Sequence, residues 1–318
     1  MGDAGPVVSL RREAGRTLHV LTGCTAVGKS EWAVRWAEAN SAEIISCDSL
    51  LFYRGMDIGT AKPTREERGR VPHHLIDIRD VAEPMNAALY ASMAFNAAEE
   101  IAARGRPILV VGGSGFYLRS FFAPIADGLH VPPETRARVA AMLESGGLPA
   151  LVGELGRLNP GGLGGLDTSN PRRVASALGR CLASGRTLAE LSLEFARAPF
   201  LFAGWEVRLA RLDRKGPELD ARIASRVEAM LNAGLVGEVT RLLGTGLRSN
   251  PSAACAIGYR ETIDVLEGRA AMDGLTGAIA RDTRALVKKQ RTWFRTQLPP
   301  HPVLDAAELG DAARLFLR

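Results

Sequence analysis

The sequence predicts an α/β protein: a P-loop parallel sheet with helices on both faces and a small helical insertion. Short apolar segments alternate with helical ones over the first third of the chain, which is typical of such a sheet. The phosphate-binding pattern G-x-x-x-x-G-K-[ST] is complete at residues 23–30 as GCTAVGKS. From about Pro124 the chain becomes rich in Gly and Pro and breaks into short helical pieces, which predicts the insertion.

The first strand, the loop and the first helix follow one another directly. Residues 17–23 (TLHVLTG) form a short apolar, β-branched run, and residues 30–40 are amphipathic. Backbone N–H groups of such a loop and of the helix N-terminus point at an anion. Lys29 adds a positive charge and Ser30 a hydroxyl suited to Mg²⁺. The order of strand, loop and helix therefore predicts a phosphate site.

Two more strands precede the insertion. Residues 42–47 (AEIISC) lead into an acid, and residues 106–113 (RPILVVGG) follow a helical stretch at about 86–104. In parallel sheets, ligands bind beyond the carboxyl ends of the strands. We therefore expect the residues at these ends to meet in one crevice: Gly23, Asp48, Gly112, Gly113 and Ser114.

We expect a first part of the catalytic core at 1–123, a helical insertion at 124–200 and a second part of the core at 201–318. Apolar residues recur at helical spacing in TRARVAAMLE and RVASALGRCLASG, which favours a helical subdomain over a linker. Residues 205–212 alternate with period two and are expected to rejoin the sheet. Long helices are expected at 217–233, 259–267 and 273–296.

Composition indicates a globular chain. The 318 residues are 46% hydrophobic, enough for a full core. No apolar run reaches the roughly 18 residues of a membrane span, and the start does not read as a signal peptide. We expect a cytoplasmic protein. The four cysteines form no C-x-x-C pair, so we expect free thiols and no structural metal.

The net charge of +5 is concentrated near the C-terminus. In residues 281–295 (RDTRALVKKQRTWFR) six Lys or Arg face one Asp, an excess equal to that of the whole chain. Composition alone favours a solvated helix face, and binding of a polyanion is the alternative.

The acid that a P-loop hydrolase needs is missing from its usual place. Such enzymes carry a Mg²⁺-binding Asp at the end of an apolar strand, but ILVVGG ends in glycines. The best acid at a strand end is Asp48, which could bind Mg²⁺, act as a general base or cap the next turn. A small-molecule kinase stays open, whereas a nucleotide-hydrolysing motor is not favoured.

Residues 48–63 (DSLLFYRGMDIGTAKP) and 73–77 (HHLID) have no generic structural explanation, being too polar for a core and too poor in Gly for a linker. Together with GCTAVGKS they resemble the tRNA dimethylallyltransferases, which prenylate an adenosine next to the anticodon. The pattern D-S-x-x-x-Y-[RK]-G-M-D-I-G-T-A-K-P of that family is met at every fixed position. The resemblance continues through VGGSGFYL, NPRR, AIGYRE and KKQRTWFR and so spans nearly the whole chain.

The resemblance implies that the loop holds the diphosphate of dimethylallyl diphosphate, with Mg²⁺ bound at Ser30 and Asp48. Asp48 would be the base that activates the adenine amine, and the catalytic set would also include Lys29, Ser114 and Arg222. Arg222 and Arg226 lie one helical turn apart, which suits a clamp, and ion pairs with Glu218 or Glu228 are the alternative. The implied diphosphate site is Gly23, Thr25, Ala26, Val27, Gly28, Lys29, Ser30, Arg222 and Arg226.

For tRNA, the resemblance implies contacts from the strand ends, the insertion and the basic helix. A stacked adenine must be extruded before it reacts, and single-stranded loops are held by cations and aromatic stacking. Trp293 and Phe294 could stack on bases, although Trp293 could also belong to the core. The implied tRNA contacts are Asp48, Ser49, Leu50, Leu51, Ser114, Arg136, Arg172, Arg173, Gly258, Tyr259, Arg260, Lys288, Lys289, Gln290, Arg291 and Trp293.

Some positions depart from the family's pattern. Ser176 and Gly179 stand where Arg and Glu are common, and Ala285 and Leu51 stand where Gln is frequent. These departures bear on tRNA contact and not on the diphosphate. We expect a monomer whose partners are tRNA and dimethylallyl diphosphate, without a membrane. The alternatives are an isopentenyltransferase that acts on free adenine nucleotide and a P-loop kinase.

Overall fold

The computed structural model describes residues 16–125, 129–198 and 200–316. The chain divides into two compact units, Met1–Ala123 with Leu201–Arg318, and Pro124–Phe200. The second unit has the bounds expected for the helical insertion, 124–200. All four cysteines are free, as predicted. Within the described ranges, no helix is both long and apolar enough to cross a membrane.

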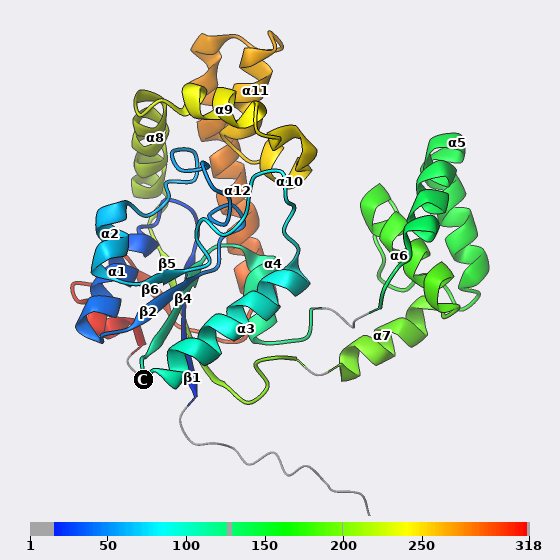
Figure 1. Ribbon diagram of the computed structural model, residues 1–318, viewed down its shortest axis with the longest axis horizontal. Helices are drawn as coiled ribbons and strands as arrows, with labels where there is room; N and C mark the ends of the chain where they lie inside the picture. The colour runs from blue at the N-terminus through cyan, green and yellow to red at the C-terminus, as the bar shows by residue number, and fades with distance from the viewer. Residues whose placement is uncertain (1–15, 126–128, 199, 317–318) are drawn as a thin grey trace, which may run out of the picture. The chain divides into compact units, whose positions relative to one another are not determined.

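The first unit is built on one sheet in which every described pair of strands is parallel (Figure 1). The strand order is β3-β2-β4-β1-β5-β6. The predicted fold class is therefore confirmed. The strands are β1 (Thr17–Gly23), β2 (Glu43–Ser46), β3 (His73–His74), β4 (Ile108–Gly112), β5 (Glu206–Asp213) and β6 (Val303–Asp305).

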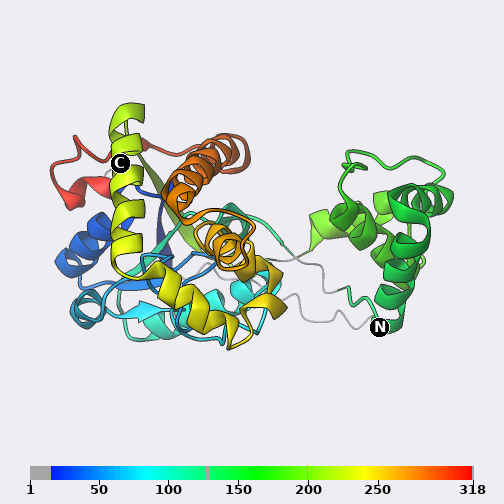
Figure 2. The ribbon, with the colours of Figure 1, turned by 90° about the horizontal axis from the view of Figure 1, so that it is seen from above.

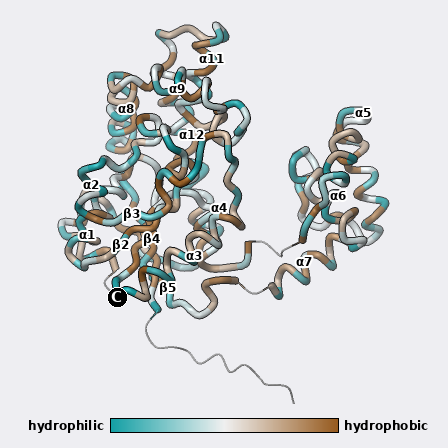
Figure 3. The backbone as a smooth tube through the Cα atoms, in the orientation of Figure 1, coloured by the Kyte–Doolittle hydropathy of each residue, from teal (hydrophilic) through white to brown (hydrophobic). Residues whose placement is uncertain are grey.

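The central strands are apolar because the sheet is covered on both faces. Val20 and Leu21 point to opposite faces of β1, and both are completely buried. Figure 3 shows the middle of the sheet in hydrophobic colours. On one face, the rings of Trp36 and Phe316 pack against His19. Continuous apolar strands of this kind are typical of parallel sheets.

The connections place helices on both faces. The chain moves across the sheet in one direction from β1 through β2 to β3 and returns from β3 to β4. Right-handed crossovers therefore put α1 (Lys29–Ala39) and α3 (Ala87–Ala103) on opposite faces. The direction reverses between the neighbouring strands β1 and β4, and ligands of open sheets bind at such a switch point.

The other helices of this unit surround the carboxyl edge of the sheet. Helices α8 and α12 pack side by side (Figure 2). The α-helices are α2 (Arg65–Arg70), α4 (Gly115–Leu118), α8 (Gly216–Asn232), α9 (Leu235–Leu243), α10 (Pro251–Ala254), α11 (Tyr259–Leu266) and α12 (Leu275–Gln297). The 3₁₀ helices are η1 (Arg119–Phe121), η2 (Leu247–Ser249), η3 (Met272–Gly274) and η4 (Ala312–Phe316).

The second unit is helical and has its own apolar core. It contains α5 (Pro133–Leu158), α6 (Pro171–Ser184) and α7 (Leu188–Arg197). Leu151 and Leu155 of α5 are completely buried against Val174 and Leu178 of α6. The predicted helical spacings therefore lie in real helices. Helix α5 kinks at Gly147, where φ is 64°, just before the proline in its interior.

The elements that were not predicted include the strands β3 and β6 and the helix α9. Strand β3 is two residues long and is defined by its pairing with Ile44 and Ile45 of β2. A pairing of this length leaves no periodic pattern in the sequence.

Candidate active site

The phosphate-binding loop leaves β1 at Gly23 and enters α1 at Lys29. A Cβ at Gly23 would lie 2.4 Å from the Leu212 carbonyl oxygen, so a larger residue does not fit. Gly28 caps α1 with φ 98°, a left-handed conformation that favours glycine. The structure thus explains why both fixed positions of the pattern are glycine.

The Lys29 ammonium lies within the loop and donates a hydrogen bond to the Cys24 carbonyl oxygen at 2.7 Å. Burial lowers the pKa of Lys29 to about 8, and the Asp48 carboxylate opposes this shift. A poorly solvated cation of this kind is stabilised strongly when an anion binds beside it.

Two arginines of α8 face the loop. Arg222 Nε donates to the Ala26 carbonyl oxygen at 2.9 Å, and Arg226 donates to the Thr60 carbonyl oxygen at 3.2 Å. Burial lowers the pKa of Arg226. Among the described residues, no carboxylate oxygen lies within 4.0 Å of a guanidinium nitrogen of Arg222 or Arg226, the distance that defines an ion pair. The alternative of surface ion pairs is therefore wrong, and both side chains are available to an anion.

Arg214 also holds the loop, and sequence reasoning missed it. Its Nε donates to the Val27 carbonyl oxygen at 2.8 Å, and its guanidinium pairs with Glu218. The signal was present, because Arg214 follows the carboxyl end of β5 at the same edge of the sheet.

Two cavities meet beside the loop. The P-loop cavity has a volume of about 560 Å³, and the cavity beside α12, called the α12 cavity, about 590 Å³. The segments that follow β1, β2 and β4 all contribute to both, so the predicted convergence of the strand ends is confirmed. The residues shared by both walls are Thr25, Asp48, Thr60, Gly113, Arg226 and Gln290.

Most of the predicted diphosphate residues line the P-loop cavity. Gly23 and Val27 do not: Val27 is completely buried, and both residues shape the loop from beneath. The residues that line the cavity are Thr25, Ala26, Gly28, Lys29, Ser30, Arg222 and Arg226.

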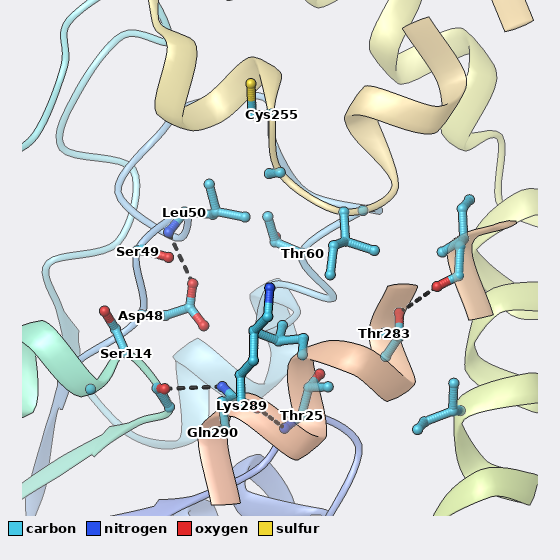
Figure 4. A pocket seen from close by; sticks show the side chains of 18 of the residues that line it. Thr25, Asp48, Ser49, Leu50, Thr60, Ser114, Cys255, Thr283, Lys289 and Gln290 are labelled. Atoms are coloured by element: carbon cyan, nitrogen blue, oxygen red, sulfur yellow. Dashed lines mark hydrogen bonds between the residues drawn. The ribbon is translucent and has the colours of Figure 1, made fainter. Parts of the chain in front are cut away.

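Asp48 lies where the two cavities join (Figure 4). Its Oδ1 accepts the Leu50 backbone N–H at 2.9 Å, so the capping interpretation holds for one oxygen. The other oxygen has no hydrogen-bond partner in the described part of the chain. Ser114 lies beside Asp48 in the α12 cavity, where its N–H donates to the Cys47 carbonyl oxygen at 3.3 Å. It begins α4 without capping it, and its hydroxyl has no hydrogen bond to the part of the chain that the structure describes, so it is available to a ligand.

Helix α12 contributes Lys289, Gln290 and Trp293 to the α12 cavity. Gln290 bridges two strand ends: its Oε1 accepts the Thr25 N–H at 3.1 Å, and its Nε2 donates to the Gly113 carbonyl oxygen at 3.0 Å (Figure 4). The amide that we expected to contact tRNA is therefore engaged with the protein backbone.

The aromatic residues of α12 differ in exposure. Trp293 is half-buried and lies so close to Gly115 that a Cβ there would approach its ring to 2.5 Å. Phe294 is completely buried, so the expectation that it stacks on a base is wrong. The packing partners of a helix determine which of its faces is buried. For this reason the adjacent rings of Trp293 and Phe294 differ in exposure.

The remaining cations of this helix also differ. Lys288 and Arg295 are exposed. Arg291 instead pairs with Asp213 at 2.6 Å and donates to the Arg214 carbonyl oxygen. Arg291, which we expected to contact tRNA, is therefore paired within the protein.

The predicted contacts at the start of α11 need correction. Gly258 is buried, and Tyr259 is completely buried with its hydroxyl donating to Glu238 Oε1 at 2.7 Å. The prediction that Gly258 and Tyr259 contact tRNA directly is therefore wrong, because both residues lie in the interior. Arg260 is exposed and pairs with Asp282 at 2.5 Å.

The other predicted tRNA residues lie in three places. Ser49 and Leu50 line the α12 cavity, and Leu51 lines the P-loop cavity. In the second unit the predicted residues are exposed on α5 and α6: Arg136, Arg172 and Arg173.

The oxygen donors of the P-loop cavity suit Mg²⁺. Ser30 is exposed there, and Asp48 lines the same cavity. Mg²⁺ usually binds through one or two protein ligands together with phosphate oxygens and water. Among the described residues, no group of three or more His, Cys, Asp or Glu could hold a metal by itself. The donors present fit a cation that arrives with a phosphate.

Glu238 is a further buried charge that sequence reasoning missed. It is 1% exposed and accepts backbone N–H groups of the loop that follows Met56. The signal was its position on the buried stripe of α9, shared with Leu235, Val239 and Leu242 at helical spacing. A carboxylate on an apolar face is informative because burying it requires partners.

A parallel sheet with this loop and these cavities at its carboxyl edge defines the class of P-loop α/β enzymes. Residues 51–297 match the family model described as IPP transferase. The chain therefore belongs to the IPP transferase family and is a prenyltransferase, which confirms the resemblance in the sequence.

Similar proteins cover nearly the whole chain. A tRNA dimethylallyltransferase of Opitutus terrae is 65% identical over 299 residues, 94% of this chain and 96% of that protein. One of Roseiflexus sp. is 38% identical over 308 residues, 95% of this chain and 97% of that protein. The full-length tRNA isopentenylpyrophosphate transferase of Bacillus halodurans has a similar structure, with a TM-score of 0.64, 32% identity and coverage of 92% of this chain and 90% of that chain.

Proposed function

We propose that this enzyme transfers a dimethylallyl group from dimethylallyl diphosphate to the exocyclic N6 amine of the adenosine 3′-adjacent to the anticodon in tRNA. The observation that carries the proposal is the position of Asp48 between a cationic cavity and a cavity with an aromatic wall. A donor diphosphate and an acceptor base would meet at this junction.

The P-loop cavity suits the leaving group. Negative charge grows on the diphosphate as its bond to the allylic carbon breaks, so fixed donors and cations stabilise the transition state. Loop N–H groups and Lys29 lie on one side, and Arg222 and Arg226 lie on the other. Mg²⁺ held by Ser30 and Asp48 would add charge neutralisation to the bound diphosphate.

Asp48 is the general base in this proposal. The amine of adenine is a weak nucleophile because its lone pair is delocalised into the ring, so a carboxylate that accepts its proton orients and activates it. The free oxygen of Asp48 would accept this proton as the new N–C bond forms and the C–O bond to diphosphate breaks. The Ser114 hydroxyl would hydrogen-bond the adenine or the leaving oxygen.

The rest of the proposed surface holds the anticodon loop. Exposed Lys288 and Arg295, with Lys289 and Trp293 at the α12 cavity, combine cations with a stacking ring. The exposed arginines of the second unit would add phosphate contacts. We further propose that the enzyme acts as a monomer in the cytoplasm.

One experiment tests the reaction against its alternatives. The purified protein is incubated with Mg²⁺, labelled dimethylallyl diphosphate and unmodified tRNA, and in parallel with AMP in place of tRNA. Label in tRNA alone is expected. Label in AMP but not in tRNA would indicate a free-nucleotide isopentenyltransferase. No label in either reaction, with phosphate transfer when ATP is supplied in a third, would indicate a kinase.

A further inference from the structure

The wall shared by the two cavities includes a loop that is held by a buried carboxylate. Gly59 lines the α12 cavity and Thr60 lines both cavities. Glu238 Oε2 accepts the N–H groups of Asp57 at 3.0 Å and Ile58 at 2.7 Å, and Oε1 accepts that of Gly59 at 3.1 Å. Consecutive backbone donors thus converge on one side chain.

Tyr259 completes this arrangement. Its hydroxyl donates to Glu238 at 2.7 Å, and its ring lies directly beneath the loop, where a Cβ at Gly59 would approach it to 2.6 Å. Burial and the neighbouring carboxylate raise the pKa of Tyr259, so the phenol stays protonated and remains a donor. Glu238 therefore has donors on both oxygens, which a buried carboxylate requires.

A second charge holds the far end of the same loop. The Lys62 side chain is 3% exposed, and its ammonium pairs with Asp57 at 2.7 Å and Asp77 at 2.5 Å. It also donates to the Tyr53 carbonyl oxygen at 2.8 Å. Residues 57–62 are thus fixed at both ends by polar contacts, which accounts for the polar composition of this segment.

This loop, residues 57–62, contacts an arginine of the diphosphate site. The Thr60 carbonyl oxygen accepts a hydrogen bond from Arg226 at 3.2 Å. No carboxylate within ion-pair distance competes for this guanidinium in the described part of the chain. We propose that Glu238 is a positioning residue for the donor diphosphate, acting through the backbone of residues 57–60 and the Thr60 carbonyl on Arg226. The inference rests on the proposed function, in which Arg226 binds the diphosphate.

Glu238→Gln tests this route. The amide offers one acceptor oxygen in place of two, so at least one loop N–H loses its acceptor. We expect the Kd for inorganic pyrophosphate with Mg²⁺, measured by calorimetry, to rise about tenfold, which equals ~1.4 kcal/mol. The KM for tRNA should stay within about twofold of the wild-type value, because none of the proposed tRNA contacts is made by residues 57–60. Thr240→Ala, on the exposed side of α9, is the matched control and should change neither value.

A double-mutant cycle separates positioning from general damage. In an Arg226→Ala background, Lys29 and Arg222 still bind pyrophosphate, and Glu238→Gln should cause no further loss. Tyr259→Phe removes one donor and should weaken binding about threefold, again only when Arg226 is present. This second variant decides the question if Glu238→Gln does not fold.

Two results would overturn the inference: unchanged pyrophosphate binding in Glu238→Gln, or an equal loss in the Arg226→Ala background. Failure of the proposed function looks different. In that case the wild-type protein itself neither binds pyrophosphate nor transfers the prenyl group to tRNA.

Discussion

The lowered pKa of Lys29 predicts a pH dependence of donor binding. Only the protonated ammonium adds a full charge to the P-loop cavity. A group with a pKa of about 8 is ~90% protonated at pH 7 and ~10% at pH 9. We therefore expect kcat/KM for dimethylallyl diphosphate to fall about tenfold between these pH values, because the group loses its proton as pH rises.

The assay is steady-state transfer into unmodified tRNA at saturating tRNA, followed from about pH 6 to 9. The profile of kcat/KM reports the free enzyme, so its falling limb should centre near pH 8. Bound diphosphate stabilises the ammonium, so the limb in kcat should lie at higher pH.

Lys29→Arg provides the control for this prediction. An arginine stays charged across the whole range, so the variant should be slower overall and should lack the limb near pH 8. A wild-type kcat/KM that stays flat to pH 9, or a limb that persists in Lys29→Arg, would refute the reasoning.

Two further predictions concern the junction and the acceptor side. Asp48→Asn keeps the shape of the side chain but removes the proton acceptor, so transfer should fall by about 10²–10⁴ while calorimetric binding of pyrophosphate in the absence of Mg²⁺ stays near the wild-type value. Normal turnover in this variant would contradict the role of Asp48 as base. Trp293→Ala should raise the KM for tRNA by about five- to a hundredfold through lost stacking, and Trp293→Phe should restore most of it. An equal rise in the KM for dimethylallyl diphosphate would contradict a role on the acceptor side.

The donor site was predictable because its elements are local in sequence. Strand β1, the loop and α1 follow one another, and each carries a pattern that depends on its own residues: an apolar run, fixed glycines and an amphipathic period. Asp48 could be placed by a topological rule, since the carboxyl ends of parallel strands share one edge. These inferences need no knowledge of distant packing.

The acceptor side was less predictable because it depends on packing between distant segments. Trp293 and Phe294 are adjacent, yet only one is completely buried, because α12 turns a particular face toward the sheet. Tyr259 belongs to a family motif but lies beneath the loop after β2 and contacts no solvent. Its partner Glu238 lies on α9, a helix that was not predicted. A short motif alone does not indicate whether its residues contact the substrate or position other residues that contact it.

The bridge made by Gln290 has a consequence for redesign of this enzyme. Its hydrogen bonds to Thr25 and Gly113 join α12 to the loop after β1 and to the end of β4. Lys288 and Arg295 on the same helix are exposed. The outward positions of α12 can therefore be varied to redirect the enzyme to another RNA. The helical turn at Gln290 should be left unchanged, because a substitution there would also change the geometry of the donor site.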